Sequence, residues 1–221
     1  MKKLFAVSAL MIIFLQSTTA QVKIGLLFSP CVNFNRVALN SDIKGNDISS
    51  AGSALGFIGG PEISFFFGSN ENYSITTGAW YAVKRGKYDR KFTGKNDKNE
   101  DVIIDSSRNS ILQYVQIPLT FKLYTNEIAT DMKLYFQIGG SVDILVGGRE
   151  VDSKIKSTKG YRAFDSSILI GSGIKYSLGE NTAVLLGLRY TRGLLNVLDS
   201  SLRDNYKVNN DMISLDLGIQ F

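Results

Sequence analysis

The sequence predicts an all-β protein, an eight-stranded antiparallel up-and-down transmembrane β-barrel. Three observations support this prediction. Apolar and polar residues alternate with a period of two in eight segments. Long and short connections between these segments alternate along the chain. The polar positions of the segments carry mostly small side chains, which suit the interior of a narrow barrel.

The first 20 residues have the pattern of a signal peptide. Lys2 and Lys3 precede a mainly apolar stretch from Leu4 to Leu15, and Thr18-Thr19-Ala20 forms a small-residue cleavage site. The apolar stretch is shorter than the ~20 residues that a spanning helix needs. We therefore expect residues 1–20 to be a signal peptide and residues 21–221 to form the outer-membrane β-barrel domain. The remaining 23 basic and 20 acidic residues are too evenly balanced for a nucleic-acid partner.

The alternation is clearest in the last segment, where Ile213, Leu215, Leu217, Ile219 and Phe221 share one face. A helix would instead need apolar residues spaced by three and four positions. In chain order, the eight predicted strands are 22–29, 54–68, 73–84, 111–124, 132–146, 164–178, 181–193 and 212–221.

The connections fall into two kinds. The short ones are 69–72, 125–131 and 178–181, and the long polar ones are 30–53, 85–110, 147–163 and 194–208. In an up-and-down meander, all long loops then lie at one end and both chain termini at the other. Outer-membrane barrels have this layout, with long extracellular loops and short periplasmic turns.

A soluble lipocalin-like ligand-binding barrel has the same strand number, so the direction of the apolar face decides between the two. The polar face carries many residues that would be unusual on a solvated sheet: Gly25, Gly78, Gly139, Gly171, Gly173, Gly187, Gly218, Ser74, Ser141, Ser167 and Ser214. These residues favour a crowded interior with the apolar face turned to lipid.

Aromatic residues mark both ends of the apolar face, as the two interfaces of a membrane require. We expect Phe67, Tyr73, Tyr176 and Phe221 near the periplasmic rim and Phe28, Tyr81, Phe164 and Tyr190 near the outer rim. Phe221 is also the expected assembly signal, because a terminal aromatic on such a strand resembles the one that the barrel-assembly machinery recognises.

The inward-facing positions include a predicted lumen charge network of Lys23, Glu62, Lys84, Lys122, Lys133, Asp143, Lys175, Arg189 and Asp216. We expect paired and hydrogen-bonded side chains to fill the lumen, since eight strands leave an interior just wide enough for side chains. Six bases against three acids leave an anion-preferring small-solute channel as the alternative.

Two further features carry structural expectations. Pro118 lies within a predicted central strand and cannot donate a ladder hydrogen bond, so a bulge or a gap in the ladder is predicted there. Segments 85–110 and 147–163 carry an excess of basic residues. These segments are candidates for contact with lipopolysaccharide or with an extracellular protein partner, or are ordinary solvated loops.

Three stretches resemble the PorT-like outer-membrane β-barrel family: Tyr114-Val115-Gln116-Ile117-Pro118-Leu119-Thr120-Phe121-Lys122, Tyr190-Thr191-Arg192-Gly193-Leu194-Leu195-Asn196 and Leu215-Asp216-Leu217-Gly218-Ile219-Gln220-Phe221. The resemblance implies a barrel in the outer membrane of a Gram-negative cell, in contact with its lipid. It does not imply a defined activity, although one branch of the family is associated with protein secretion.

The residue inventory argues against an enzyme. The chain has no histidine, which removes Ser-His-Asp and Cys-His catalysis and most zinc sites. Cys31 is the single cysteine, so no disulfide forms within the chain. We expect no cofactor and no catalytic or metal site. The predicted function is a non-enzymatic integral outer-membrane barrel with a structural or accessory role.

Overall fold

A computed structural model describes residues 21–39, 47–95, 101–150, 160–179, 181–198 and 206–221. The predicted signal peptide, residues 1–20, lies outside the described residues. The elements are β1 Gln21–Leu39, β2 Asp47–Ser50, β3 Ser53–Phe67, the short 3-10 turn η1 Ser69–Glu71, β4 Tyr73–Gly78, β5 Trp80–Lys95, β6 Asp101–Ala129, β7 Met132–Glu150, β8 Phe164–Ser177, β9 Ala183–Gly193 and β10 Tyr206–Gln220. Within these ranges, no helix is long and apolar enough to cross a membrane.

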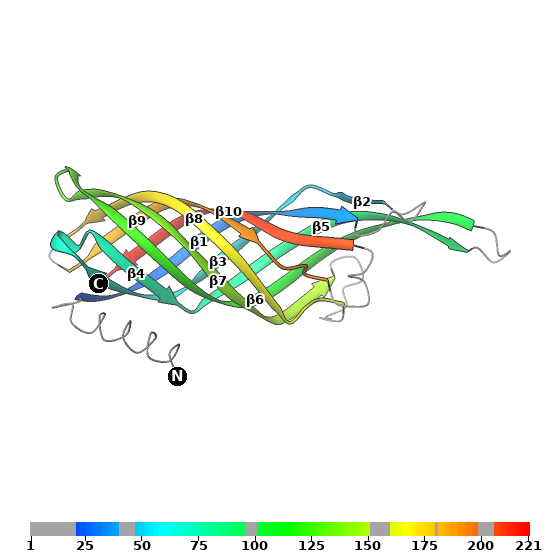
Figure 1. The fold of residues 1–221 in the computed structure, drawn as a ribbon, viewed down its shortest axis with the longest axis horizontal. Helices are drawn as coiled ribbons and strands as arrows, with labels where there is room; N and C mark the ends of the chain where they lie inside the picture. Colours follow the sequence, from blue (N-terminus) through cyan, green and yellow to red (C-terminus); the bar gives the residue numbers. More distant parts are fainter. Residues whose placement is uncertain (1–20, 40–46, 96–100, 151–159, 180, 199–205) are drawn as a thin grey trace, which may run out of the picture.

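The strands pair antiparallel and close on themselves (Figure 1). The ring runs β1-β10-β9-β8-β7-β6-β4-β3 and returns to β1, so eight of the ten strands form it. The other two extend ring strands: β5 continues β4 after the single residue Ala79, and β2 lies two residues before β3 and pairs with β5. The all-β, antiparallel, up-and-down barrel predicted from the sequence is therefore confirmed.

The short turns and the two ends of the described chain lie at one end of the barrel, which we call the terminal mouth (Figure 1). At the other end, the hairpin mouth, β5 and β6 project well beyond the remaining strands. The predicted turn 125–131 is much tighter than expected. β6 continues to Ala129 through two register shifts, and the left-handed conformation of Asp131 closes the hairpin.

The predicted long connection 85–110 is mostly a β-ribbon. Its two strands pair continuously outward from the membrane, up to Lys95 opposite Asp101. Val102-Ile103-Ile104 extends β6. The polar composition of this segment gave no sign of these strand extensions. Outside lipid, two paired strands can form their backbone hydrogen bonds with each other without a strict alternation of apolar residues.

The ladder around Pro118 is interrupted as predicted. β4 pairs with β6 up to Thr77–Leu119, and β5 resumes at Trp80–Gln116, without a change of register. At this point the Thr77 hydroxyl donates to the Pro118 carbonyl at 2.7 Å. The proline nitrogen therefore falls where the facing ladder is already open.

Alternation divides the two faces of the wall sharply. In β9, buried and exposed residues alternate without exception from Ala183 to Gly193. The barrel strands expose many large Leu, Ile, Val, Phe and Tyr side chains, whereas most of the buried polar residues point inward. A soluble barrel would place these apolar side chains inside, so the lipocalin-like alternative is wrong.

Candidate functional site

The centre of the barrel is crossed by an ion pair between two neighbouring strands. The Arg189 guanidinium lies 3.0 Å from Asp216 Oδ1 and 4.7 Å from the centre of the Trp80 ring. Ser29 donates to Asp216 Oδ1 at 2.8 Å, and Gln137 donates to Asp216 Oδ2 at 3.2 Å. Five strands thus contribute to one buried network, in which both charges have partners.

A second network lies nearer the hairpin mouth. Lys84 donates to Asp143 at 2.6 Å and to Asp165 at 3.3 Å, and its ammonium lies over the Tyr114 ring. Ser141 donates to Asp143 at 2.9 Å, which links β7 to the hydroxyl and amide groups of its neighbours. This layer is also fully buried.

Towards the terminal mouth, Lys122 pairs with Glu62 at 3.5 Å and Lys23 pairs with Glu71 at 3.1 Å. Lys133 donates to the carbonyl of Asn70 at 3.2 Å. Lys23 and Lys133 are less buried than the charges above them, so they form the rim of the mouth.

The cavity described between the layers is small. A cavity beside Arg189, Asp216, Lys122 and Glu62 has a volume of about 10 Å³, room for a single water molecule at most. Glycines make this packing possible. The Tyr135 ring lies against the backbone of Gly173 and Gly187, where an added Cβ would overlap it.

The hairpin mouth is covered by an apolar cluster. Val197 and Leu198, from the segment between β9 and β10, pack with Tyr88 and Val208, and Tyr161 covers them. Tyr161 also pairs with Leu198 through a β-bridge. Parts of two inter-strand connections therefore fold back over the opening of the barrel.

The structure buries seven of the nine predicted network residues and places Lys23 and Lys133 at the rim. The expected shortage of acids was overstated, because Asp165 and Glu71 also pair with interior lysines. Alternation from Phe164 would have placed Asp165 inside. The same alternation places Trp80 inside, because it is an even number of positions from the inward-facing Lys84. Glu71 lies in a turn, where alternation does not predict the direction of a side chain.

The predicted interface aromatics lie on the outer face, and two groups of them contact one another. Phe67 and Tyr73 stack with ring centres 5.8 Å apart, and Phe121 completes this cluster near the terminal mouth. Phe28 and Tyr81 form a second cluster through Phe57. Phe57 and Phe121 were not singled out in the sequence, although both lie on outward positions. Phe67 is only half-exposed; the other seven predicted aromatics are exposed.

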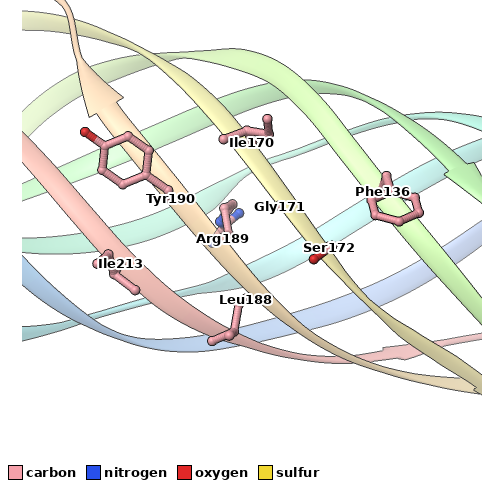
Figure 2. A pocket seen from close by; sticks show the side chains of 8 residues that line it. All are labelled: Phe136, Ile170, Gly171, Ser172, Leu188, Arg189, Tyr190 and Ile213. Carbon is pink, nitrogen blue, oxygen red and sulfur yellow. The ribbon is translucent and has the colours of Figure 1, made fainter.

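A hollow in the lipid-facing wall lies over β7 to β10, and Figure 2 shows the residues that line it. Its volume is about 430 Å³, and Phe136, Ile170, Leu188, Tyr190 and Ile213 stand around it. Ser172 lies between Phe136 and Leu188 in the strand register, and its small side chain creates the depth. The hollow lies within the lipid-facing apolar surface.

The end of the chain completes the ring. Phe221 and Ile24 exchange two backbone hydrogen bonds of 2.8 and 3.2 Å, one step beyond the pairing of Gln220 with Gly25. The Phe221 side chain is 54% exposed on the outer face. The terminal residue therefore contributes both to closure and to the aromatic surface near the terminal mouth.

Deleting Phe221 is expected to lower the amount of protein in the outer membrane of cells while leaving refolding into detergent partly intact. The deletion removes two closing hydrogen bonds and one aromatic, whose burial is worth about 1.5–3 kcal/mol, but most of the ladder remains. Membrane fractionation measures the amount of protein in the outer membrane, and in vitro refolding measures the folded yield in detergent, for the wild-type chain and the chain without Phe221. Wild-type insertion of the shortened chain would contradict a role in recognition by the assembly machinery.

The described residues contain no group of three or more His, Cys, Asp or Glu side chains that could hold a metal ion. A closed antiparallel ring with an apolar exterior and a polar, side-chain-filled interior defines an integral outer-membrane β-barrel. The model of the outer membrane protein beta-barrel domain family matches residues 14–199, and the chain belongs to this family. Its location is the outer membrane of the cell.

The chain is also similar to solved outer-membrane barrels of low sequence identity. The outer membrane protein OprG from Pseudomonas aeruginosa is 11% identical, with a TM-score of 0.50 over 93% of this chain and 98% of that one. Neisserial surface protein A is 16% identical (TM-score 0.45; 89% of this chain, 95% of that one), and the N-terminal barrel domain of Pseudomonas aeruginosa OprF is 13% identical (TM-score 0.44; 92% and 100%). The match to OprG supports the fold. No curated protein matches the sequence significantly.

Proposed function

We propose that this protein is a non-conducting, non-enzymatic, eight-stranded outer-membrane barrel with a structural or accessory role. Its wall and filled interior form a rigid support, and the long hairpin-mouth segments are the surface that meets a partner outside the cell. The observation that carries this proposal is the continuous filling of the lumen.

The filling has three parts that a solute would have to displace. The Arg189–Asp216 network joins five strands at the centre, and the Lys84–Asp143–Asp165 network lies nearer the hairpin mouth. The apolar cluster around Leu198 covers the opening beyond them. Passage of a solute would break these buried ion pairs. Each broken pair would leave a buried charge without its partner, which is strongly unfavourable in free energy.

An anion-preferring channel is the competing proposal, and the excess of lysine at the terminal mouth favours it. Against a channel, the cavity beside Arg189 is only about 10 Å³, far below the space that a hydrated ion needs. The basic residues of the central layers are also paired with carboxylates.

Planar-bilayer recording distinguishes the two proposals. The refolded full-length mature barrel is expected to give no steady openings above the membrane background, with an open porin recorded in parallel as the positive control. Reproducible ion-selective steps would contradict the filled-lumen proposal and support the channel.

The partner is proposed from the hairpin-mouth segments. Segments 85–110 and 147–163 carry more basic than acidic residues, which favours contact with the anionic head groups of lipopolysaccharide. The resemblance to PorT-like proteins adds an accessory role in protein secretion as the specific form of this proposal. Mild crosslinking in intact outer membranes followed by identification of the crosslinked proteins tests it, and recovery of lipid alone would contradict a protein partner.

A further inference from the structure

Lys175 is a buried lysine at the terminal mouth. Its side chain points into the barrel from β8, and the residue is 7% exposed. Among the described residues, no carboxylate forms an ion pair with its ammonium. The ammonium instead lies 4.5 Å from the centre of the Phe66 ring and 5.2 Å from that of Tyr124.

Three further lysines lie towards the same mouth of the barrel. Lys23 lies 5.2 Å from the centre of the Phe66 ring that Lys175 contacts. Lys133 is directly opposite Lys175 in the register of β7 and β8, and Lys122 lies 5.9 Å from the centre of the Tyr135 ring. Like charges at facing strand positions repel each other, so this arrangement opposes folding unless something compensates it.

The carboxylates of the mouth compensate only half of these charges. Glu71 pairs with Lys23 and Glu62 pairs with Lys122. Glu127 faces Lys133 in the strand register, but it is exposed, and Lys133 binds a backbone carbonyl instead. Aromatic rings attract ammonium groups, but the free energy gained from this attraction is smaller than the free-energy cost of burying an unpaired charge.

We propose that the terminal mouth binds an oxyanion of the phosphate class between Lys175, Lys133 and Lys23. A tetrahedral anion offers several oxygens, and each flexible lysine can donate to a different one. Free phosphate, a phosphorylated solute and the phosphate of a lipid head group share this chemistry. The site lies at the rim, so it requires no passage through the filled lumen.

Thermal unfolding of the full-length mature barrel in a phosphate-free nonionic detergent tests the proposal. Inorganic phosphate is added in increasing concentration, and it replaces chloride so that the ionic strength stays constant. The unfolding midpoint is expected to rise with phosphate and to saturate, because a ligand that binds only the folded state stabilises it. No rise beyond that given by chloride would overturn the proposal.

Lys175→Gln and Lys207→Gln form the matched pair of variants. Lys207 is an exposed lysine on β10 at the opposite mouth. Lys175→Gln should fold at least as well without phosphate, because it removes an unpaired buried charge, and should bind phosphate at least tenfold more weakly. Lys207→Gln should bind like the wild type. Equal weakening in both variants would mean general charge screening and would overturn the site; if Lys175→Gln fails to fold, Lys23→Gln replaces it in the same comparison.

Nanodiscs separate the two sources of phosphate. In discs of phosphatidylglycerol, a site filled by lipid head groups should no longer respond to added inorganic phosphate, and Lys175→Gln should lose the extra stability that these discs give. A site for free phosphate should respond equally in discs and in detergent. Absence of both responses would overturn the proposal.

Discussion

Asp216→Asn is expected to lower the free energy of unfolding by about 3–5 kcal/mol, the usual cost of breaking a buried ion pair from one side. Asparagine has the same shape as aspartate, so the substitution leaves no cavity. It leaves the Arg189 guanidinium, which is 2% exposed and 3.0 Å from the lost charge, without a carboxylate. Urea unfolding of the refolded barrel in lipid vesicles measures the loss.

The double variant Asp216→Asn/Arg189→Met is the control. Methionine removes the orphaned charge and fills part of the same volume, so the double variant should recover part of the stability lost by Asp216→Asn. A loss below about 1 kcal/mol in the single variant would mean that water reaches the pair, since exposed ion pairs contribute only about that much. Such a result would also contradict the non-conducting barrel and favour the channel.

Ile138→Arg is expected to cost about 2–4 kcal/mol and to reduce the yield of folded barrel strongly, because arginine is unfavourable at the middle of the lipid-facing surface. Ile138 is 56% exposed on β7, between Phe121 of β6 and Ile170 of β8 in the register. Folding yield and unfolding free energy in vesicles measure the effect.

Ile128→Arg is the matched control. Ile128 is equally exposed, but it lies at the end of β6, next to the terminal-mouth hairpin. Beyond the apolar band the same substitution should cost about 0–1 kcal/mol. Equal losses in both variants would contradict the assigned depth of Ile138. Gln137→Arg is a poorer comparison, because Gln137 already binds Asp216 in the crowded interior.

In the barrel interior, the alternation of residues along each strand predicts which side chains point inward but not which of them form pairs. Alternation assigned Arg189 and Asp216 to the inside, but it could not pair them, since residues of neighbouring strands meet only after the register is set. Glu71 shows the same limit more clearly. It lies in a turn with left-handed backbone geometry and reaches Lys23 across 48 positions of sequence.

The apolar cluster at the hairpin mouth could not be predicted from the sequence either. Segment 194–208 had the composition of a polar loop, yet Val197 and Leu198 fold back and bury themselves against Tyr88. Nothing in the local sequence distinguishes an apolar residue that caps a barrel from one that is scattered in a loop. Only the position of the neighbouring strands makes that contact available.

The sequence by itself determined the antiparallel meander, the two faces of its wall and the end at which the short turns lie. It could do so because a strand turns alternate residues to opposite sides, and lipid accepts only apolar ones. The tertiary structure alone decided the ion pairs and the apolar cover of the hairpin mouth. These depend on the register and closure of the ring, which bring residues from distant strands into one layer.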